Sequence, residues 1–126
     1  MHNDPSELQT LADAEGLRAY GEADWGGMAV NVNHFPPGFD LTGILKQVPG
    51  AACPVPHWGY VFGGSFTVGY TDGTSETIGT GEVFHLRAGH DVLRSEGGVS
   101  YVEFSPAAEQ AAMSNEMAKV MGQGAD

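Results

Sequence analysis

Side chains that can bind a metal ion are concentrated in two short stretches of the sequence, residues 53–64 and 81–90. Imidazole nitrogens and thiolates are ligands for transition metals, and a thiolate favours zinc, copper(I) or iron over magnesium. A fully extended chain would separate residues 53 and 57 by about 13 Å. Pro54 and Pro56 must therefore bend this segment if both of its ends are to contact one ion. The candidate metal ligands are Cys53, His57, His85 and His90.

The periodicity of a β-strand limits which of these side chains can converge. His90 lies two residues before Val92, so both project from the same face of a regular strand, about 7 Å apart. His85 shares a face with Val83, and the sequence leaves open whether that face points inward. Three histidines on facing strands would be enough for an open metal site. The alternatives are a hydrogen-bonded core histidine, a turn histidine and a buried, unreactive cysteine.

Glu103 is the best placed carboxylate for a general base, because a buried carboxyl near a histidine can have its pKa tuned toward neutral pH. A solvated or ion-paired Glu103 is the alternative, and Tyr60 is the second candidate catalytic residue. Arg87 could pair with a substrate carboxylate or lie exposed at a strand end. Other aromatic side chains could line a pocket for an apolar or planar ligand, or simply fill the core. These are Trp58, Phe62, Phe66, Phe84 and Tyr101.

The composition narrows the class of protein. A chain of 126 residues with 41% hydrophobic content suits one globular domain. Five basic residues against 16 acidic ones give a formal net charge of -11, which repels phosphate backbones and anionic lipids and argues against nucleic-acid and membrane partners. The single cysteine allows no intrachain disulfide, and the first residues lack the pattern of a secretory signal. We therefore expect a cytoplasmic protein.

Short strands are the main elements that must position these side chains. Met28, Val30 and Val32 alternate with small or polar residues and predict one strand, and a further extended piece is expected over residues 41–45. Asp72-Gly73 between two alternating runs predicts a hairpin. Further strands are predicted at residues 57–62, 65–70, 75–78, 83–86, 92–94 and 99–104. Many short strands with tight turns predict an all-β sandwich or barrel.

A helix is predicted at each end of the chain. Asp4-Pro5-Ser6-Glu7 is typical of a helix start, with Glu7 reaching back to the nitrogen of Asp4, and the helix is expected to run to about Glu15. Ser105 and Pro106 predict the start of a second helix that ends near residue 121, with Ser105 as its cap. The apolar face of this helix, which predicts packing on the core or on a dimer partner, contains Met113, Met117, Val120 and Met121.

Two parts of the chain resemble the motifs of the cupin superfamily, G-x5-H-x-H-x(3,4)-E-x6-G and G-x5-P-x-G-x2-H-x3-N. Residues 60–64, Tyr-Val-Phe-Gly-Gly, are similar to the end of the first motif, and residues 81–89 are similar to the second, with both glycines in register. The run Cys-Pro-x-Pro-His-Trp-Gly-Tyr-Val further resembles a subgroup of short bacterial cupins of unassigned role. The resemblance implies one domain, residues 1–126, with a cupin-type jelly-roll barrel over about residues 28–104.

The metal ligands of the cupin motifs are mostly replaced in this sequence. Counting back from Gly64, the motif glutamate falls on His57, and the two histidines fall on Cys53 and Ala51. In the second motif the proline, histidine and asparagine positions hold Arg87, Val92 and Glu96. The resemblance implies a protein that binds a small molecule and that is a mononuclear metal-dependent enzyme of the lyase, isomerase or dioxygenase type. Its ligand set would be non-standard, and its metal would be zinc, iron or manganese. A metal-free binding or sensing barrel is the alternative, and a homodimer is expected.

Overall fold

The computed structural model describes residues 2–14 and 16–122, so the predicted helix end at Glu15 lies outside the described residues. The elements before the long fifth strand are η1 (Pro5–Glu7), β1 (Gln9–Ala14), β2 (Leu17–Trp25), β3 (Met28–Phe35), β4 (Phe39–Asp40), α1 (Thr42–Leu45) and η2 (Pro49–Ala51). Those that follow are β5 (His57–Tyr70), β6 (Ser75–Gly79), β7 (Val83–Leu86), β8 (His90–Ser95), β9 (Val99–Pro106) and α2 (Ala107–Val120).

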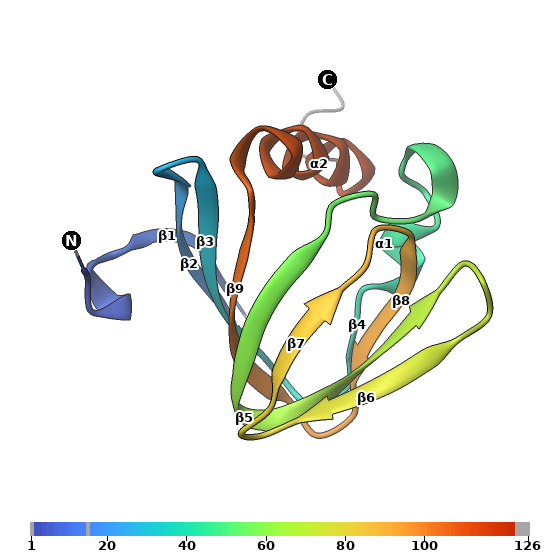
Figure 1. The fold of residues 1–126 in the computed structure, drawn as a ribbon, viewed down its shortest axis with the longest axis horizontal. Coiled ribbons are helices and arrows are strands. Elements are labelled where there is room, and N and C mark those ends of the chain that lie inside the picture. The colour runs from blue at the N-terminus through green and yellow to red at the C-terminus, as the bar shows by residue number, and fades with distance from the viewer. Residues whose placement is uncertain (1, 15, 123–126) are drawn as a thin grey trace.

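Within the described residues, nine strands form one antiparallel sheet that curls on itself (Figure 1). The order along the main path is β1-β2-β3-β9-β5-β8-β4, and β6 and β7 also pair with β5. The hairpin predicted at Asp72-Gly73 joins β5 to β6, where Gly69 pairs with Ser75. This arrangement is an all-β barrel, as the sequence predicted, with a helical turn before it and a helix after it.

The long strand β5 belongs to both halves of the barrel. Its first half pairs with β7 and β9, and its second half pairs with β6 and β8. The change of direction falls at Gly63-Gly64, directly after the register with β9 shifts between Val61 and Gly63, and Figure 1 shows the bend clearly. The two separate strands predicted at residues 57–62 and 65–70 are therefore one strand, bent where the glycines suggested a turn.

The core fills the space inside the curled sheet. Its largest members include Phe66, Phe84 and Tyr101, whose rings contact one another with centroids 5.2 to 5.9 Å apart. Helix α2 lies across one end of the barrel (Figure 1) and contacts β2, β3 and β9. Met113 of this helix is buried in the core, and Met117 and Val120 pack partly against it. The predicted apolar face of the C-terminal helix thus covers the protein's own core.

Three local predictions were wrong in part. The N-terminal helix is limited to the turn Pro5–Glu7, although the predicted contact from Glu7 to the Asp4 nitrogen is present at 3.0 Å. Residues Gln9–Ala14 form strand β1 instead, because they pair with β2 and so extend the sheet before residue 28. Residues Thr42–Leu45 form helix α1 rather than a strand. For residues 9–14, pairing with the next strand, β2, outweighs the helical spacing of apolar residues.

No helix in the described part of the chain has both the length and the apolar character needed to cross a membrane.

The bend in β5 generates a prediction about Gly64. Its φ of +72° lies in the left-handed region, and a Cβ at this position would overlap the backbone carbonyl of Gly98 on the neighbouring chain segment. We expect Gly64→Ala to lower the free energy of unfolding by about 3 kcal/mol or more. The matched control is Gly73→Ala, which has a similar φ of +88° but no atom within 4 Å of the added methyl group. Urea denaturation of both variants measures the difference, and equal losses would contradict the proposed overlap.

Candidate metal centre

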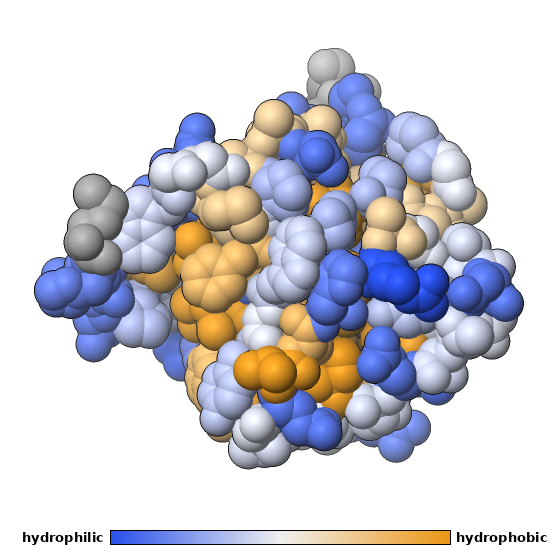
Figure 2. All heavy atoms as spheres, in the orientation of Figure 1, coloured by the Kyte–Doolittle hydropathy of each residue, from blue (hydrophilic) through white to orange (hydrophobic). Residues whose placement is uncertain are grey.

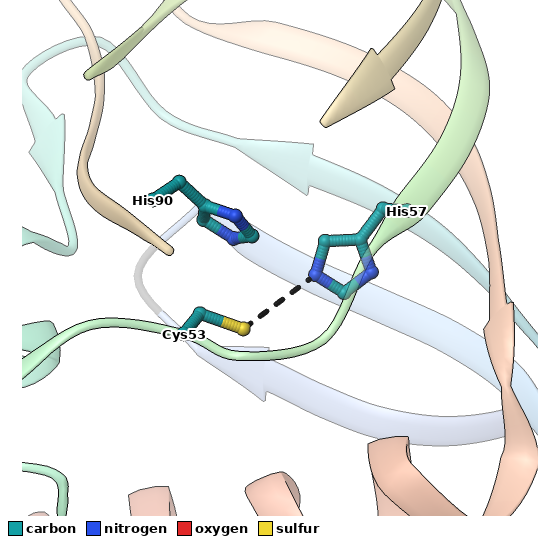
Figure 3. A group of neighbouring side chains, drawn as sticks. All are labelled: Cys53, His57 and His90. Carbon is teal, nitrogen blue, oxygen red and sulfur yellow. Dashed lines mark hydrogen bonds between the residues drawn. The ribbon is translucent and has the colours of Figure 1, made fainter. Parts of the chain in front are cut away.

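Cys53, His57 and His90 converge at one end of the barrel (Figure 3). One potential ligand atom from each residue lies within 4.8 Å of the other two, and all three side chains are buried. Cys53 is held by two backbone hydrogen bonds: its N–H donates to the carbonyl of His90, and its carbonyl accepts from Gly89. His57 begins β5, and His90 begins β8. Two chain segments, residues 53–57 and the start of β8, therefore meet at this cluster.

The segment from Cys53 to His57 is bent, as its prolines predicted. The sulfur of Cys53 lies 3.8 Å from Nε2 of His57, far closer than an extended segment would allow. Val55, between the two prolines, is fully buried and anchors the bend in the core. In a tetrahedral zinc site, sulfur and nitrogen ligands lie about 3.5 Å apart. The observed separation is close to that value, so these two side chains fit a shared ion.

Hydrogen bonds from outside the cluster orient both imidazoles. Nδ1 of His90 lies 2.9 Å from the backbone oxygen of Arg87, which can only accept, so Nδ1 carries the proton and Nε2 keeps its lone pair. Nδ1 of His57 lies 2.5 Å from Oγ of Ser105, which leaves Nε2 toward Cys53. Metal-binding histidines usually have such partners on their second nitrogen. Both rings are therefore arranged as metal ligands are.

Ser105 has a different role from the one predicted. Helix α2 begins after Pro106 and has no side-chain cap, whereas the Ser105 hydroxyl contacts His57 and is almost completely buried. Ser105 lies on β9, and the inward face of this strand brings it beside the start of β5. The prediction of a capping serine was wrong because the strand continues through this residue.

Burial lowers the pKa of both histidines in the cluster. The pKa of His57 falls to about 4, and that of His90 is lowered chiefly by burial as well. Both rings are thus neutral at neutral pH, which is the form that binds metals. Burial also raises the pKa of the Cys53 thiol to about 11. Without a metal the cysteine is protonated, so metal binding at neutral pH would release the thiol proton.

Glu103 is a carboxylate that lies beside this cluster. It is buried on β9, and Oε2 lies 3.9 Å from Nδ1 of His57. Burial raises the pKa of Glu103 to about 7, partly offset by His90 and by a hydrogen bond with Asn33. Asn33 also bonds to the buried hydroxyl of Tyr101. A chain of buried polar groups thus leads from Tyr101 through Asn33 to Glu103 beside the cluster.

His85 and Tyr60 lie away from the cluster, on the outer surface of the sheet. The exposed His85 ring stacks on Trp58, with centroids 4.9 Å apart and an interplanar angle of 6°. Tyr60 and Phe62 are also on this outer side and are each more than two-fifths exposed. Side chains alternate along a strand, so Trp58 points outward because its neighbour His57 points inward. His85 pairs with Trp58 on the adjacent strand and therefore also points outward. The structure therefore does not bring the predicted metal ligand His85, the predicted catalytic residue Tyr60 or the predicted pocket residues Trp58 and Phe62 to the cluster.

The remaining predicted pocket residues also occupy other positions. Phe66, Phe84 and Tyr101 point inward but fill the core by contact with one another. Arg87 has an exposed side chain that lies 3.4 Å from Asp72 and over the ring of Tyr70. Its contribution to the cluster is the backbone carbonyl that orients His90.

Sequence reasoning missed Ser105 and Asn33 as parts of the site. Asn33 occupies a buried position on β3, in a strand whose apolar alternation was recognised. The alternation placed Asn33 on the face opposite Met28, Val30 and Val32, which is the polar side of the predicted strand, so nothing in the sequence signalled its burial. Ser105 gave no signal either, since Ser-Pro before a helical run also suits a helix start.

Two hollows on the described part of the molecule lie elsewhere. One of about 280 Å³ lies between α2 and strands β2 and β3, and one of about 310 Å³ lies beside β5 and β8. Neither is lined by Cys53, His57 or His90.

Comparisons with solved structures support the fold. A protein of unknown function from Rhizobium leguminosarum bv. viciae 3841 is 19% identical over 83% of this chain and 94% of its own, with a TM-score of 0.61. An RmlC-like cupin from Shewanella frigidimarina NCIMB 400 is 17% identical over 86% of this chain and 92% of its own, with a TM-score of 0.59.

An oxalate decarboxylase from B. subtilis is also similar in structure. It is 16% identical over 81% of this chain but only 28% of its own length, with a TM-score of 0.55.

No protein-family model matches the sequence, and no curated protein does. The fold of this protein is that of the cupin superfamily.

The shifted pKa values predict how stability depends on pH in the metal-free protein. Glu103 has a raised folded-state pKa, so its ionisation costs stability as pH rises from about 4.5 to about 7. His57 has a lowered pKa and acts in the opposite sense, since stability rises as pH rises from about 4 to about 6.5. In the wild type the two effects oppose each other over most of this range.

Glu103→Gln removes the titrating carboxyl and leaves the pH dependence of stability that is caused by His57. We expect the free energy of unfolding of the variant, relative to the wild type, to increase by up to about 3 kcal/mol between pH 4.5 and 7 and to level off above that. Denaturant titrations at several pH values, with a chelator present, measure the difference. A difference that does not change with pH would contradict the raised pKa of Glu103.

Proposed function

We propose that this protein binds one divalent transition metal through Cys53, His57 and His90 and uses it to act on a small organic molecule. The observation that carries the proposal is the convergence of three buried ligand-type side chains from two chain segments, residues 53–57 and the start of β8. A purely structural role would be served at least as well by apolar side chains of similar size. The hydrogen bonds to Ser105 and to the Arg87 carbonyl hold the imidazoles as ligands need to be held.

The donor set favours some metals over others. Two imidazole nitrogens and one thiolate suit zinc or ferrous iron better than manganese, which prefers oxygen ligands. Three protein ligands leave a fourth position for water or substrate, which is the pattern of catalytic rather than structural zinc sites. Zinc and iron are therefore the first metals to test, with manganese as the third.

The residues around the cluster indicate the kind of chemistry. A bound metal would act as a Lewis acid toward an oxygen of the substrate. Glu103 lies beside His57 and can accept or donate a proton at Oε2, supported by Asn33 on its other side. A proton-transfer role for this carboxyl is most consistent with a lyase or an isomerase, while dioxygenase chemistry would make no evident use of it.

Charge limits the class of substrate. All five lysine and arginine side chains of the sequence are exposed, so none offers its charge inside the barrel. An anionic group of a substrate would have only the metal as a positive partner. We therefore expect a small substrate that is neutral, or that binds the metal through its one anionic group.

Metal analysis of wild type and variants tests the proposal. Protein purified without an affinity tag and reconstituted with zinc, iron or manganese should bind about one equivalent of metal, and Cys53→Ala and His57→Ala should each lose it. The matched control is His85→Ala, which removes an exposed histidine outside the cluster and should leave the stoichiometry unchanged. In the cobalt(II)-substituted wild type, a sulfur-to-metal charge-transfer band should report thiolate ligation and should be absent in Cys53→Ala.

Two results would contradict the proposal in different ways. Wild type that holds no stoichiometric metal after reconstitution with all three metals would exclude metal binding. A small molecule retained by such metal-free protein in native mass spectrometry would then identify a binding or sensing barrel. Metal that survives His57→Ala unchanged would instead show that the ligands are assigned wrongly.

A further inference from the structure

Five large apolar side chains are exposed on one side of the sheet. They are Trp58, Tyr60, Phe62, Val83 and Phe104, which together are called here the apolar face. Each is at least 39% exposed, and Val83 is 80% exposed. Among the described residues, only Leu11 and Met121 are exposed large hydrophobic side chains outside this face. The exposed apolar surface is thus concentrated in one place.

The strand register shows that the apolar face is continuous. Trp58 on β5 pairs with Phe104 on β9, and Tyr60 on β5 pairs with Val83 on β7. Paired residues project from the same side of a sheet, so these side chains lie side by side across three adjacent strands. Figure 2, in the orientation of Figure 1, shows hydrophobic side chains gathered over this region of the molecule.

The size of the apolar face is compatible with a protein interface. If an aromatic side chain has about 200 Å² of surface, the five side chains expose about 450 Å² in total. This area is within the range of patches that mark interaction sites, about 300–600 Å². It is also more than half of the roughly 800 Å² that each partner contributes to a standard interface. The polar rim of an interface would supply the remainder.

Charge indicates which partner fits. The chain has a net charge of -11, so two copies repel each other over most of their surfaces. On β5, β7 and β9, the outward positions between residues 58 and 62, 83 and 85, and 100 and 104 carry no acidic or basic side chain other than His85. A second copy can therefore meet this face without bringing like charges together, and a two-fold axis makes an apolar surface complementary to itself.

We propose that the apolar face is the interface of a homodimer. The dimer was expected from the methionines of the C-terminal helix, but Met113, Met117 and Val120 pack against the protein's own core. The interface lies instead on the outer side of the strands whose inner side holds His57 and Glu103. It is independent of metal binding, so the two proposals can fail separately.

Light scattering coupled to size-exclusion chromatography tests this proposal. The wild type should have a mass of about 26 kDa, twice the 13.2 kDa of the chain. The double variant Phe62→Glu/Val83→Glu should be a monomer of half that mass, because dimerisation would bury four added charges. The control is Met121→Glu, which introduces one such charge at an exposed apolar residue directly after α2 and should remain a dimer.

Each other outcome counts against the proposal. A wild type that is monomeric at high micromolar concentration would exclude a second copy as the partner. A double variant that stays dimeric would exclude this face, and a dimer lost in Met121→Glu would move the interface to α2. Circular dichroism checks that the variants fold. If the double variant does not, Val83→Glu alone provides the same test, because Val83 contacts little in the monomer.

Discussion

The candidate metal centre depends on the bend in strand β5. This strand has 14 residues, and a straight strand of that length would place its ends about 43 Å apart. Its first residue, His57, belongs to the centre, and its last residue, Tyr70, pairs with His90, which also belongs to it. The bend at Gly63-Gly64 returns the strand to the same end of the barrel, so that its first residue is a member of the centre and its last residue pairs with another member (Figure 1).

The centre places polar groups where the surrounding core is apolar, and this has a cost. Burial shifts the pKa of His57 downward and that of Glu103 upward, so both groups are held toward their neutral forms. Ser105, Asn33 and the Arg87 carbonyl supply hydrogen bonds that reduce the cost. Such an arrangement is unusual for a site that serves packing alone, and it is typical of functional sites. A metal ion would stabilise the thiolate and use both imidazole lone pairs.

Strands β5 and β9, which hold His57 and Glu103, also carry most of the proposed dimer interface. Side chains alternate between the two faces of a strand, so His57 and Glu103 point into the barrel while their neighbours Trp58 and Phe104 point out. A partner packed on the outer side would restrain the strands that hold the site. The two proposals thus place metal binding and self-association on opposite faces of one short region of sheet.

Much of the second half of the fold was predictable from residue types. Glycine-rich turns and two-residue alternation predicted the strands after residue 57, and Asp72-Gly73 predicted its hairpin, because these signals depend on the backbone preferences of nearby residues. The first half was less predictable. Strand β1 exists through its pairing with β2, and local spacing alone suggested a helix.

The sequence by itself determined the chemical character of the site, an inventory of imidazoles, one thiol and carboxylates, and it determined the class of fold. The tertiary structure decided which members of that inventory meet. His85 and His90 are equal as residue types, yet one stacks on Trp58 outside and the other faces Cys53 inside. The contact between His57 and Ser105 joins residues 48 positions apart. Local residue preferences do not specify such contacts, because the pairing and register of distant strands decide which face of each strand becomes the interior.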